Sequence, residues 1–520
     1  MTAGWWNEAT SATAKLVLAG ATLAVVAGDL ARKRAAATTA ASTTASPIER
    51  WRKKALAALG VLGVLAYFNF GAFHFNGIYV HLWDSLHHYL GAKYIDELGY
   101  DGLYDCIAVA DAEDPVLGPR AAQRALTDLR TNGMTTAADV VAHPERCTAR
   151  FSAARWSDFK GDVAFFRGRF PDADWQNVTR DHGFNASPVW LLLAHPLAGA
   201  GPVTVTRLGV LAALDPLLMI AALAMLVWAF GWERAALVAV VWGTYFPGRL
   251  WWTGGSFLRW DWLAALLAGL ALSRRERPVA GGVLLAYASL SRVFPAFALA
   301  GALLAAAVSV VRRQKVERAI ARVLLGAAVA AALLAPLASA VRRGPGWSDF
   351  ARNLAKHTSV PSANRMGLAT VVAFDPAATQ RALDRQGGDT RGRWEAAQAG
   401  TLERRRWLWI ALALVGVGAI ALAVRGQPAW AACVLGLLLV PLGRPLACYY
   451  YAFVAALPLA SERRADVAGI ALALALASGI VARMTGFGVD EQYAAQSLLV
   501  LLAIGFMASS FIGRLRPAKT

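Results

Sequence analysis

Long apolar runs recur along the whole chain, and they constrain its fold more than any other feature. A helix needs roughly 17 to 25 predominantly apolar residues to cross a bilayer. The best candidate runs are 55–75, 206–230, 256–272, 294–311, 319–341, 407–424, 446–460, 467–484 and 494–512. Shorter runs at 188–200, 235–246, 279–290 and 429–442 are predicted to be spans or half-spans. We therefore expect an all-α polytopic membrane protein with about 11 to 13 transmembrane helices.

Composition and charge agree with this class. Of 520 residues, 57% are hydrophobic and only 17% are charged, too few to cover a soluble core of this size. The net charge of +18 would indicate nucleic acid binding in a soluble protein. Here the basic residues lie in short clusters between apolar runs, at 32–34, 50–54, 274–277, 312–322, 463–464 and 514–516. Such clusters are typical of cytoplasmic loops, so we expect membrane lipids and not nucleic acid as partners.

Placing these clusters in the cytoplasm puts residues 80–185 on the outer side of the membrane. This first outer loop holds 16 acidic and 11 basic residues. A second polar segment, 342–406, is also expected outside, although it carries 12 basic and 6 acidic residues. The charges do not fix the order of helices between 184 and 272, where one run could be broken or re-entrant.

Four regions follow from this layout. Residues 1–54 contain the run 16–30, an extra or an interfacial helix, and a low-complexity stretch, 35–46, predicted to be a flexible linker. Residues 55–341 form a membrane module that includes a long, partly helical outer loop. Residues 342–406 form the outer polar segment, and residues 407–520 form the C-terminal transmembrane helices.

The four cysteines fall into two pairs. Cys106 and Cys147 both lie in the predicted outer loop, where an oxidising compartment permits a disulfide. The sequence gives no distance between them, so a bonded pair and two free thiols both remain open. Cys433 and Cys448 lie in or beside apolar runs and are predicted to be buried, inert thiols.

Motifs for nucleotide chemistry are absent from the sequence. It contains no P-loop, no dinucleotide glycine fingerprint after a strand, no HExxH and no Gly-x-Ser-x-Gly elbow. A cytoplasmic enzyme or pump driven by nucleotides is therefore not expected.

Residues 79–106 carry the strongest chemical signal, because Asp84 and three histidines directly follow the first apolar run of 55–75. If 79–98 is partly helical, Asp84 and His88 share a face, and His81 lies one turn before Asp84. A carboxylate at the mouth of an apolar helix lies where a lipid headgroup can meet its partner. The alternative is that Asp84 is a solvated end residue or an N-cap, with histidines that only bond backbone or water.

The pattern of this segment resembles the first outer loop of GT-C membrane glycosyltransferases, on Asp84, Tyr89, Ala92, Tyr94, Gly99, Leu103 and Tyr104. It is most similar to mannosyltransferases and arabinofuranosyltransferases that use polyprenyl-phosphate sugars. Further similar elements follow in the same order at 187–188, 194–197, 252–255, 274–275, 280–282 and 291–295. The resemblance covers about residues 61–311. Where relatives often show Gly-Gln-x-Asn, this chain has Gly254, Gly255, Ser256, Phe257 and Leu258, so donor contacts are not carried over there.

The resemblance implies a GT-C-like bundle that moves a mannose-like sugar or a pentose. The donor would be a polyprenyl phosphate, and a lipid or glycan acceptor would take the sugar with inversion on the outer face. Such transfer needs a base for the acceptor hydroxyl and donors for the departing phosphate. We expect Asp84 to be the base. No cofactor is required, although a divalent cation at Asp84 and a histidine is compatible with the sequence.

Two sets of residues are expected to bind substrate. The predicted donor-phosphate ligands are His357, Arg292, Arg365 and Lys356. Other predicted substrate-binding residues are His81, His87, His88, Tyr89, Asn364 and Arg259. Arg292 lies between apolar runs, where a charge is costly unless it is paired or faces water. The alternative for 347–368 is an amphipathic helix on anionic headgroups.

Two rival classes remain open. One is a transporter or flippase of lipid-linked sugars, which would show repeat symmetry between its halves. The other is a membrane assembly protein in which Asp84 has no chemical role. Abundant alanine and arginine are compatible with a bacterial source, and we expect the cytoplasmic membrane with the active site on its outer side.

Overall fold

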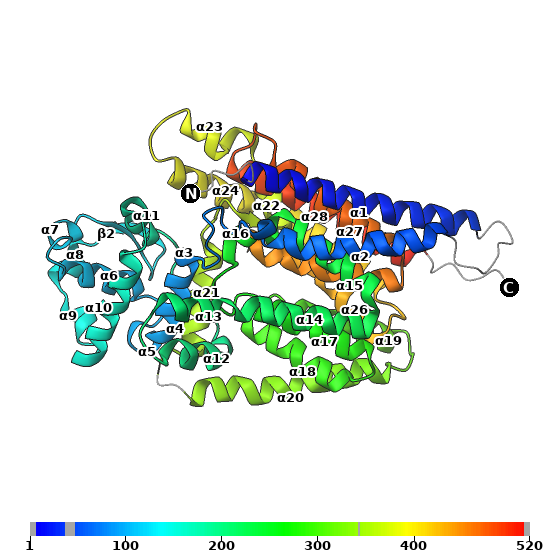
Figure 1. Cartoon of the computed structure of the whole chain (residues 1–520), viewed down its shortest axis with the longest axis horizontal. Coiled ribbons are helices and arrows are strands. Elements are labelled where there is room, and N and C mark those ends of the chain that lie inside the picture. Colours follow the sequence, from blue (N-terminus) through cyan, green and yellow to red (C-terminus); the bar gives the residue numbers. More distant parts are fainter. Residues whose placement is uncertain (1–6, 37–46, 342–343, 514–520) are drawn as a thin grey trace.

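The computed structural model describes residues 7–36, 47–341 and 344–513, and these are predominantly helical with four short strands. A bundle of long helices carries a smaller domain at one end (Figure 1). Three parts of the predicted layout lie outside the described residues: most of the linker at 35–46, the pair Arg342 and Arg343, and the basic cluster at 514–516.

The helices of the bundle are α1 (Glu8–Ala36), α2 (Pro47–Tyr67), α13 (Val205–Ala212), α14 (Leu214–Phe230), α15 (Trp232–Thr244), α17 (Asp261–Arg274), α18 (Pro278–Ser291), α19 (Ala296–Val311), α20 (Arg318–Ala340), α25 (Arg406–Ala423), α26 (Ala429–Gly436), η5 (Leu437–Leu442), η6 (Cys448–Glu462), α27 (Asp466–Ala482) and α28 (Val489–Ile512). Within the described ranges, five helices are long and apolar enough to cross a membrane: Glu8–Ala35, Val205–Phe230, Arg318–Ala340, Arg406–Ala423 and Val489–Ile512.

Large apolar side chains cover the outward faces of these helices. Leu333 on α20 is 65% exposed, Leu414 on α25 is 66% exposed and Phe506 on α28 is 60% exposed. A contiguous surface of this kind is unfavourable in water and favourable in hydrocarbon. The predicted helical class is confirmed, and the apolar faces agree with a membrane protein.

Small residues allow some helices of the bundle to approach closely. A Cβ atom on Gly243 of α15 would lie 1.9 Å from the Gly63 carbonyl oxygen of α2. A Cβ atom on Gly282 of α18 would lie 2.0 Å from the Val323 carbonyl oxygen of α20. Glycine at these contacts is therefore a requirement of helix packing, as is common between transmembrane helices.

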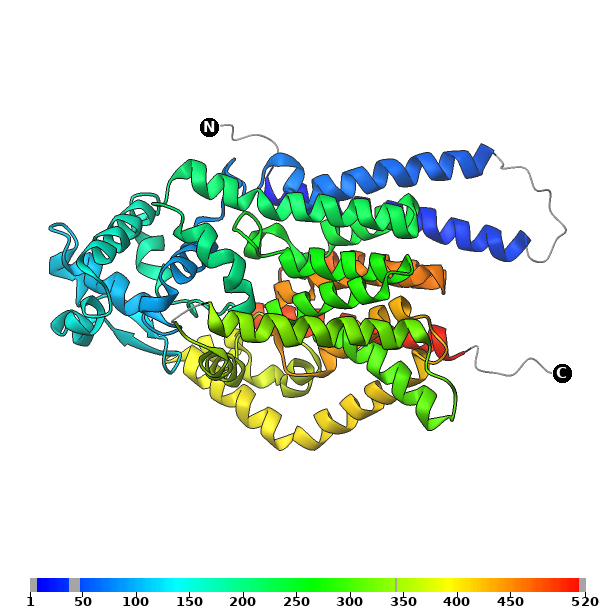
Figure 2. The same ribbon diagram turned by 90° about the horizontal axis from the view of Figure 1, so that it is seen from below.

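The smaller domain, which we call the cap domain, comprises residues 82–178. Its elements are α3 (Leu82–Ser85), η2 (Leu86–Leu90), α4 (Gly91–Lys93), α5 (Ile95–Leu98), α6 (Leu103–Ala112), α7 (Gly118–Ala121), β1 (Ala125–Asp128), β2 (Gly133–Thr136), α8 (Ala138–Ala142), α9 (Glu145–Thr148), α10 (Ala153–Arg167) and α11 (Asp172–Val178). The strands β1 and β2 form an antiparallel hairpin. In Figure 2 this domain lies beyond the ends of the bundle helices.

Buried ion pairs hold the cap domain together. Lys93 lies 2.6 Å from Asp162, and the Tyr94 hydroxyl donates to the same carboxylate. Asp111 accepts from Arg124 and from the Trp175 indole. Each buried charge therefore has several partners, which is the condition for keeping it inside.

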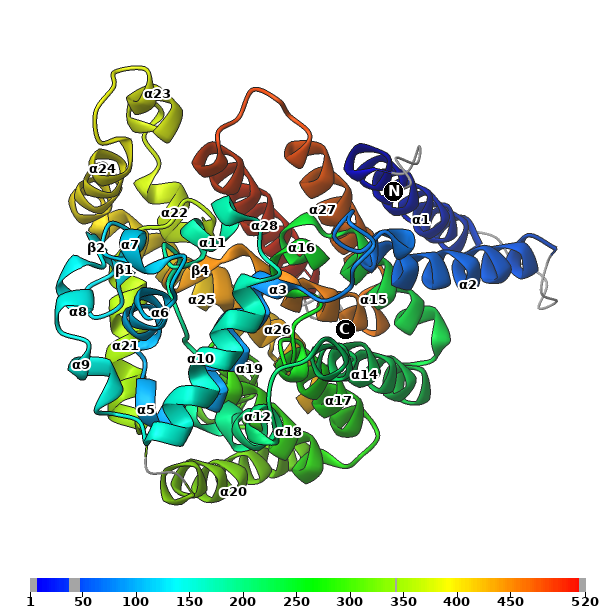
Figure 3. The same cartoon turned by 60° about the vertical axis from the view of Figure 1, so that its left-hand side comes forward.

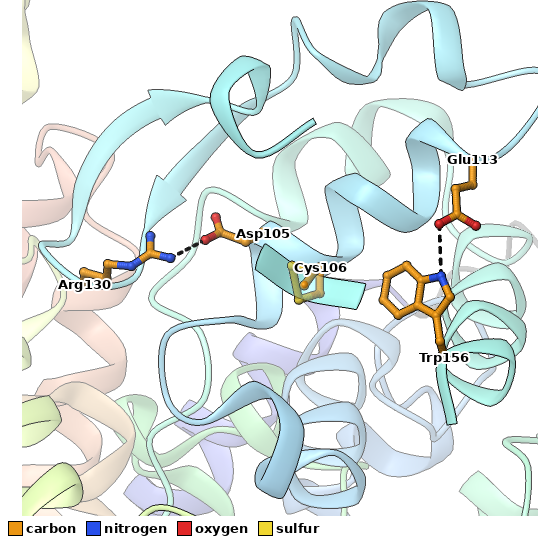
Figure 4. The surroundings of a disulfide bond; sticks show 6 residues. Asp105, Cys106, Glu113, Arg130 and Trp156 are labelled. Carbon is orange, nitrogen blue, oxygen red and sulfur yellow. Dashed lines mark hydrogen bonds and ion pairs between the residues drawn. A yellow bond between two sulfur atoms is a disulfide. The ribbon is translucent and has the colours of Figure 1, made fainter. Parts of the chain in front are cut away.

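The structure joins Cys106 of α6 to Cys147 of α9 by a disulfide, with a Cα–Cα distance of 5.4 Å (Figure 4). Beside it, Arg130 donates to Asp105 at 2.7 Å and the Trp156 indole donates to Glu113 at 3.0 Å. Cys433 and Cys448 are free and buried, as predicted.

The remaining elements lie around the junction of bundle and cap domain. They are η1 (Asn69–Gly71), α12 (Pro188–Gly199), η3 (Phe246–Gly248), α16 (Leu250–Thr253), α21 (Trp347–Ser359), β3 (Arg365–Met366), α22 (Leu368–Ala373), η4 (Pro376–Ala378), α23 (Gln380–Asp384), α24 (Thr390–Arg404) and β4 (Leu446–Ala447). Strands β3 and β4 pair antiparallel. In Figure 3, the pair α1 and α2 lies at one edge of the bundle.

The end of the bundle away from the cap domain, which we call the basic end, brings the basic clusters together. Arg52 at the start of α2 lies 3.1 Å from Glu233 at the start of α15 and 3.5 Å from Asp29 near the end of α1. Arg274 at the end of α17 lies 2.7 Å from Glu462 at the end of η6. The described clusters that the sequence placed in one compartment therefore lie at one end of the molecule.

Three predicted helix boundaries were wrong. The run 55–75 is helical only to Tyr67, because Asn69 and Phe70 adopt positive φ. The run 256–272 becomes helical only at Asp261, after a loop with Gly255 at φ +85. The run 446–460 forms a 3₁₀-helix over Cys448–Glu462, and Pro458 in its interior lacks the N–H of a regular α-helix.

Replacing Cys106 by Ser should loosen the cap domain without disturbing the bundle. The disulfide closes a loop with a sequence separation of 41, and its loss should cost about 2 to 4 kcal/mol of cap-domain stability. Limited trypsin digestion in detergent should cut Cys106→Ser within 82–178 faster than wild type. Cys433→Ser is the matched control, and equal digestion of all three proteins would contradict this expectation.

Candidate active site

A cavity of about 1070 Å³ lies between the cap domain and the bundle. Segments far apart in the sequence line it: 74–88, 169–185, 251–259, 353–365 and 445–450. Among the predicted site residues, those that line it are His81, Asp84, His87, His88, Arg259, His357, Asn364 and Arg365. We call it the Asp84 cavity.

Asp84 lies in the short helix α3, and His81 caps that helix. The Asp84 backbone N–H donates to His81 Nδ1 at 3.0 Å. His81 Nδ1 is therefore an acceptor, so Nε2 carries the proton and donates to the Trp251 carbonyl at 2.9 Å. Both ring nitrogens are used by backbone groups, so the prediction that His81 binds substrate is not supported by its placement. His81 positions Asp84.

Arg259 is the charged partner of Asp84. Arg259 Nε lies 3.0 Å from Asp84 Oδ2, and both side chains are largely buried. The pair lacks hydrogen-bond geometry, and Asp84 Oδ2 has no hydrogen-bond partner among the described residues. Arg259 therefore balances the charge of the carboxylate at Oδ2, the oxygen that is buried.

His88 bridges these two residues. Its Nδ1 lies 3.5 Å from Asp84 Oδ2, which confirms the predicted shared helical face. Its Nε2 lies 2.6 Å from Arg259 Nη1. A guanidinium can only donate, so His88 Nε2 accepts and the ring is neutral with its proton on Nδ1. The imidazole thus orients the guanidinium beside the carboxylate.

Protonation states in this cluster follow from burial and from Arg259. Burial acts to raise the pKa of Asp84, but Arg259 and the neighbouring histidines outweigh it and hold that pKa below its usual value. Burial lowers the pKa of His88 well below its usual value, and Arg259 lowers it further. At neutral pH the cluster therefore contains one carboxylate, one guanidinium and a neutral imidazole.

The loop 254–260 fixes the position of Arg259. A Cβ atom on Gly255 would lie 1.8 Å from the Tyr79 carbonyl oxygen, so the loop packs directly against the segment that leads to Asp84. Asp215 of α14 is completely buried and accepts the backbone N–H of Arg259 at 2.9 Å and that of Trp260 at 3.2 Å. A buried carboxylate in an apolar helix thus holds the loop in place.

Arg365 and His357 contribute basic and imidazole groups from the segment after α20. Arg365 donates to the carbonyls of His357 and Thr358. The β3–β4 pairing and the bond from Cys448 N to the Asn364 carbonyl at 2.9 Å connect this segment to Tyr449 and Tyr450. Arg259 approaches the same region, with its guanidinium carbon 5.8 Å from the Tyr449 ring centre.

His357 and His182 form a pair of imidazoles in the cavity wall. Their ring centres are 6.0 Å apart. His357 Nε2 and His182 Nδ1 are buried and have no hydrogen-bond partner among the described residues. Burial, together with Lys356, His182 and Arg365, lowers the pKa of His357 to about 3. Burial also lowers the pKa of His182. Both rings are therefore neutral at neutral pH, and each carries one N–H.

Three other predicted site residues are placed differently from the expectation. His87 lines the cavity, but its nitrogens bond the Trp83 carbonyl at 2.8 Å and the Tyr104 hydroxyl at 2.7 Å. Tyr89 is fully buried and donates to the Gly201 carbonyl. Lys356 donates to the Leu129 carbonyl and does not line the cavity. The polar atoms of all three side chains are bonded to other groups of the protein. The Tyr104 hydroxyl and the carbonyls of Gly201 and Leu129 are distant in the sequence, so these bonds could not be predicted locally.

Arg292 also does not line the cavity. It is 6% exposed, with its guanidinium carbon 5.6 Å from the Trp190 ring centre and one nitrogen bonded to the Ser291 carbonyl. Its other terminal nitrogen, Nη2, is buried without a hydrogen-bond partner among the described residues. Arg292 therefore does not line the cavity, and its predicted role as a phosphate ligand stays a prediction.

Sequence reasoning missed several residues that line the cavity, most clearly Trp83, Phe170, Asp174, Asp181, His182, Tyr449 and Tyr450. The sequence holds a signal for two sets of these residues. The triplet Tyr449 to Tyr451 stands at the start of an apolar run, and Asp181 and His182 form a polar pair directly before the run 188–200. The others come together only through the fold.

The divalent cation that the sequence allows at Asp84 and a histidine stays a prediction. Both nitrogens of His81 are used by backbone groups, and Arg259 Nε lies 3.0 Å from Asp84 Oδ2. Within the described ranges, no group of three or more His, Cys, Asp or Glu side chains is placed to hold a metal ion.

Comparison of the chain with protein-family models, with curated proteins and with solved structures finds no match. The function is therefore argued from the site itself.

Replacing Arg259 by Met should raise the pKa of Asp84. Burial raises this pKa and the Arg259 guanidinium lowers it, so removing the guanidinium leaves the effect of burial less opposed. Infrared spectroscopy near neutral pH should show a new protonated-carboxyl band in Arg259→Met. The double variant Asp84→Asn, Arg259→Met should lack that band. A spectrum of Arg259→Met identical to wild type would show that the guanidinium does not control this carboxyl.

Proposed function

We propose that this protein is a GT-C-type glycosyltransferase that uses a polyprenyl-phosphate sugar. The observation that carries the proposal is that the ionised Asp84 carboxylate, Arg365 and two neutral imidazoles, His182 and His357, line one cavity. Sugar transfer from a lipid phosphate needs a base for the acceptor and donors for the leaving phosphate. One cavity supplies both.

In this mechanism Asp84 takes the proton from the acceptor hydroxyl as its oxygen attacks the anomeric carbon. The bond from that carbon to the phosphate oxygen breaks, and the carrier leaves as a polyprenyl phosphate. His357 and Arg365 stabilise the charge that develops on the phosphate. Because the nucleophile attacks opposite the leaving group, a single displacement inverts the anomeric centre.

The charge distribution supports an outward-facing site. The described basic clusters lie at the basic end, and the Asp84 cavity lies at the cap end. Under the positive-inside rule this arrangement places the cavity outside the cytoplasm. The chain then passes between the two ends in α1, α2, α14, α15, α17, α18, α19, α20, α25, α26 with η5, η6, α27 and α28. We propose that these segments cross the membrane of a bacterial cell.

Asp84→Asn should reduce sugar transfer by about 10² to 10⁴-fold, because the amide keeps the shape of the side chain and removes the base. The assay supplies polyprenyl-phosphate mannose or polyprenyl-phosphate arabinofuranose to protein in nanodiscs, with acceptor extracted from the source membranes. Asp105→Asn, outside the cavity, is the matched control. Donor retention by Asp84→Asn should equal that of wild type.

Transfer by Asp84→Asn at the wild-type rate would reject the assignment of Asp84 as the base. Donor binding and movement across the bilayer without any transfer by wild type would favour the flippase alternative.

Protonation of Asp84 should not reduce the transfer rate as the pH falls from neutral to 3.8, the usual pKa of an aspartate. The pKa of Asp84 lies below that value in the folded protein, so the base stays ionised until the pH falls below it. A profile measured at saturating donor checks this. An acidic limb near pH 6 that moves in Asp84→Glu would contradict it.

A further inference from the structure

The two sides of the Asp84 cavity differ in chemistry. The side formed by the bundle and its loops presents two cations, Arg259 and Arg365, among the aromatic residues Trp251, Trp252, Tyr449 and Tyr450. The side formed by the cap domain and the segment after it presents Trp83, Phe170, Asp174 and Asp181. We call this second side the aromatic wall. The proposed donor phosphate is matched by the first side, which leaves the aromatic wall without an assigned ligand.

The aromatic wall is held in a fixed arrangement. The Trp83 indole donates to Asp181 Oδ2 at 2.8 Å, and Asp181 Oδ1 accepts the His182 backbone N–H at 2.8 Å. The Trp83 and Phe170 rings meet edge to face, with their centres 6.3 Å apart. Phe170 in turn packs 5.9 Å from Trp175. Both rings that line the cavity are therefore positioned before any ligand binds.

Asp174 adds a free acceptor to this wall. It lies in the first turn of α11, and its carboxylate has no hydrogen-bond or ion-pair partner among the described residues. Aromatic faces carry partial negative charge and attract the C–H face of a sugar ring, and carboxylates accept hydrogen bonds from hydroxyls. Rings beside a carboxylate thus match the chemistry of a carbohydrate.

The charge of the aromatic wall argues against an anionic ligand there. Arg169 is the cation on this wall, and its guanidinium carbon lies 3.5 Å from the Phe165 ring centre. It also donates to the Phe165 carbonyl at 2.9 Å. It is therefore bound to its own helix end, while two carboxylates, Asp174 and Asp181, remain on the wall. A phosphate would be repelled.

We propose that the aromatic wall, with Trp83, Phe170 and Asp174, is the acceptor subsite and binds a neutral glycan. The role as acceptor subsite rests on the proposed function. The binding of a neutral glycan is independent of that function. In this arrangement the glycan lies along the cap domain and its terminal hydroxyl reaches Asp84, with the donor phosphate at the cationic side.

Calorimetry on the full chain in nanodiscs tests this proposal, with mannotriose and arabinotriose as probes. Phe170→Leu removes a ring while keeping an apolar side chain, and Asp174→Asn removes a charge. Each should weaken the binding of at least one trisaccharide about three- to tenfold. Asp172→Asn is the matched control, since Asp172 lies on the same helix α11 but does not line the cavity, and it should bind like wild type.

Failure of this inference and failure of the proposed function give different results. Wild-type affinity in both Phe170→Leu and Asp174→Asn, or no trisaccharide binding to wild type, would overturn the acceptor subsite. So would binding of mannose 6-phosphate that equals the binding of the neutral sugars. Trisaccharide binding that depends on Asp174, in a protein that transfers no sugar from either donor, would support the glycan site and reject the glycosyltransferase proposal.

Discussion

The contact between Arg259 and Asp84 is the interaction on which the site depends. A carboxylate buried at this depth would take up a proton if no cation balanced it. Arg259 keeps Asp84 ionised, and His88 fixes the geometry of the pair. The guanidinium approaches the buried oxygen Oδ2 without hydrogen-bond geometry. The ion pair therefore keeps Asp84 ionised, which is the state that a general base requires.

This contact in turn depends on the bundle. Arg259 sits in a loop that Asp215 holds from the interior of α14 through two backbone N–H groups. Asp84 sits at the start of the cap domain, whose fold is closed by buried ion pairs and the Cys106–Cys147 disulfide. The cavity forms where these two rigid parts meet. Its cationic side and its aromatic wall therefore belong to different parts of the molecule, as the proposal of a charged donor and a neutral acceptor requires.

Much of the fold can be predicted because hydrophobic length and basic clusters act locally along the chain. The shared face of Asp84 and His88 is also local, since four residues separate them on a helix. The placements of Lys356, Tyr89 and Arg292 could not be predicted, because each depends on a distant partner such as the Leu129 carbonyl or the Trp190 ring. The loop at 254–260 was missed for a similar reason: its apolar residues resemble a helix, but Asp215 and Gly255 impose a turn.

A structure of the protein in nanodiscs with a non-transferable phosphonate analogue of a polyprenyl-phosphate sugar tests the central claim most directly. The account predicts the phosphonate within hydrogen-bond distance of His357 or Arg365, with the anomeric carbon turned toward the Asp84 carboxylate. Density for the analogue at the basic end of the bundle, or bound in the cavity with its sugar turned away from Asp84, would contradict it.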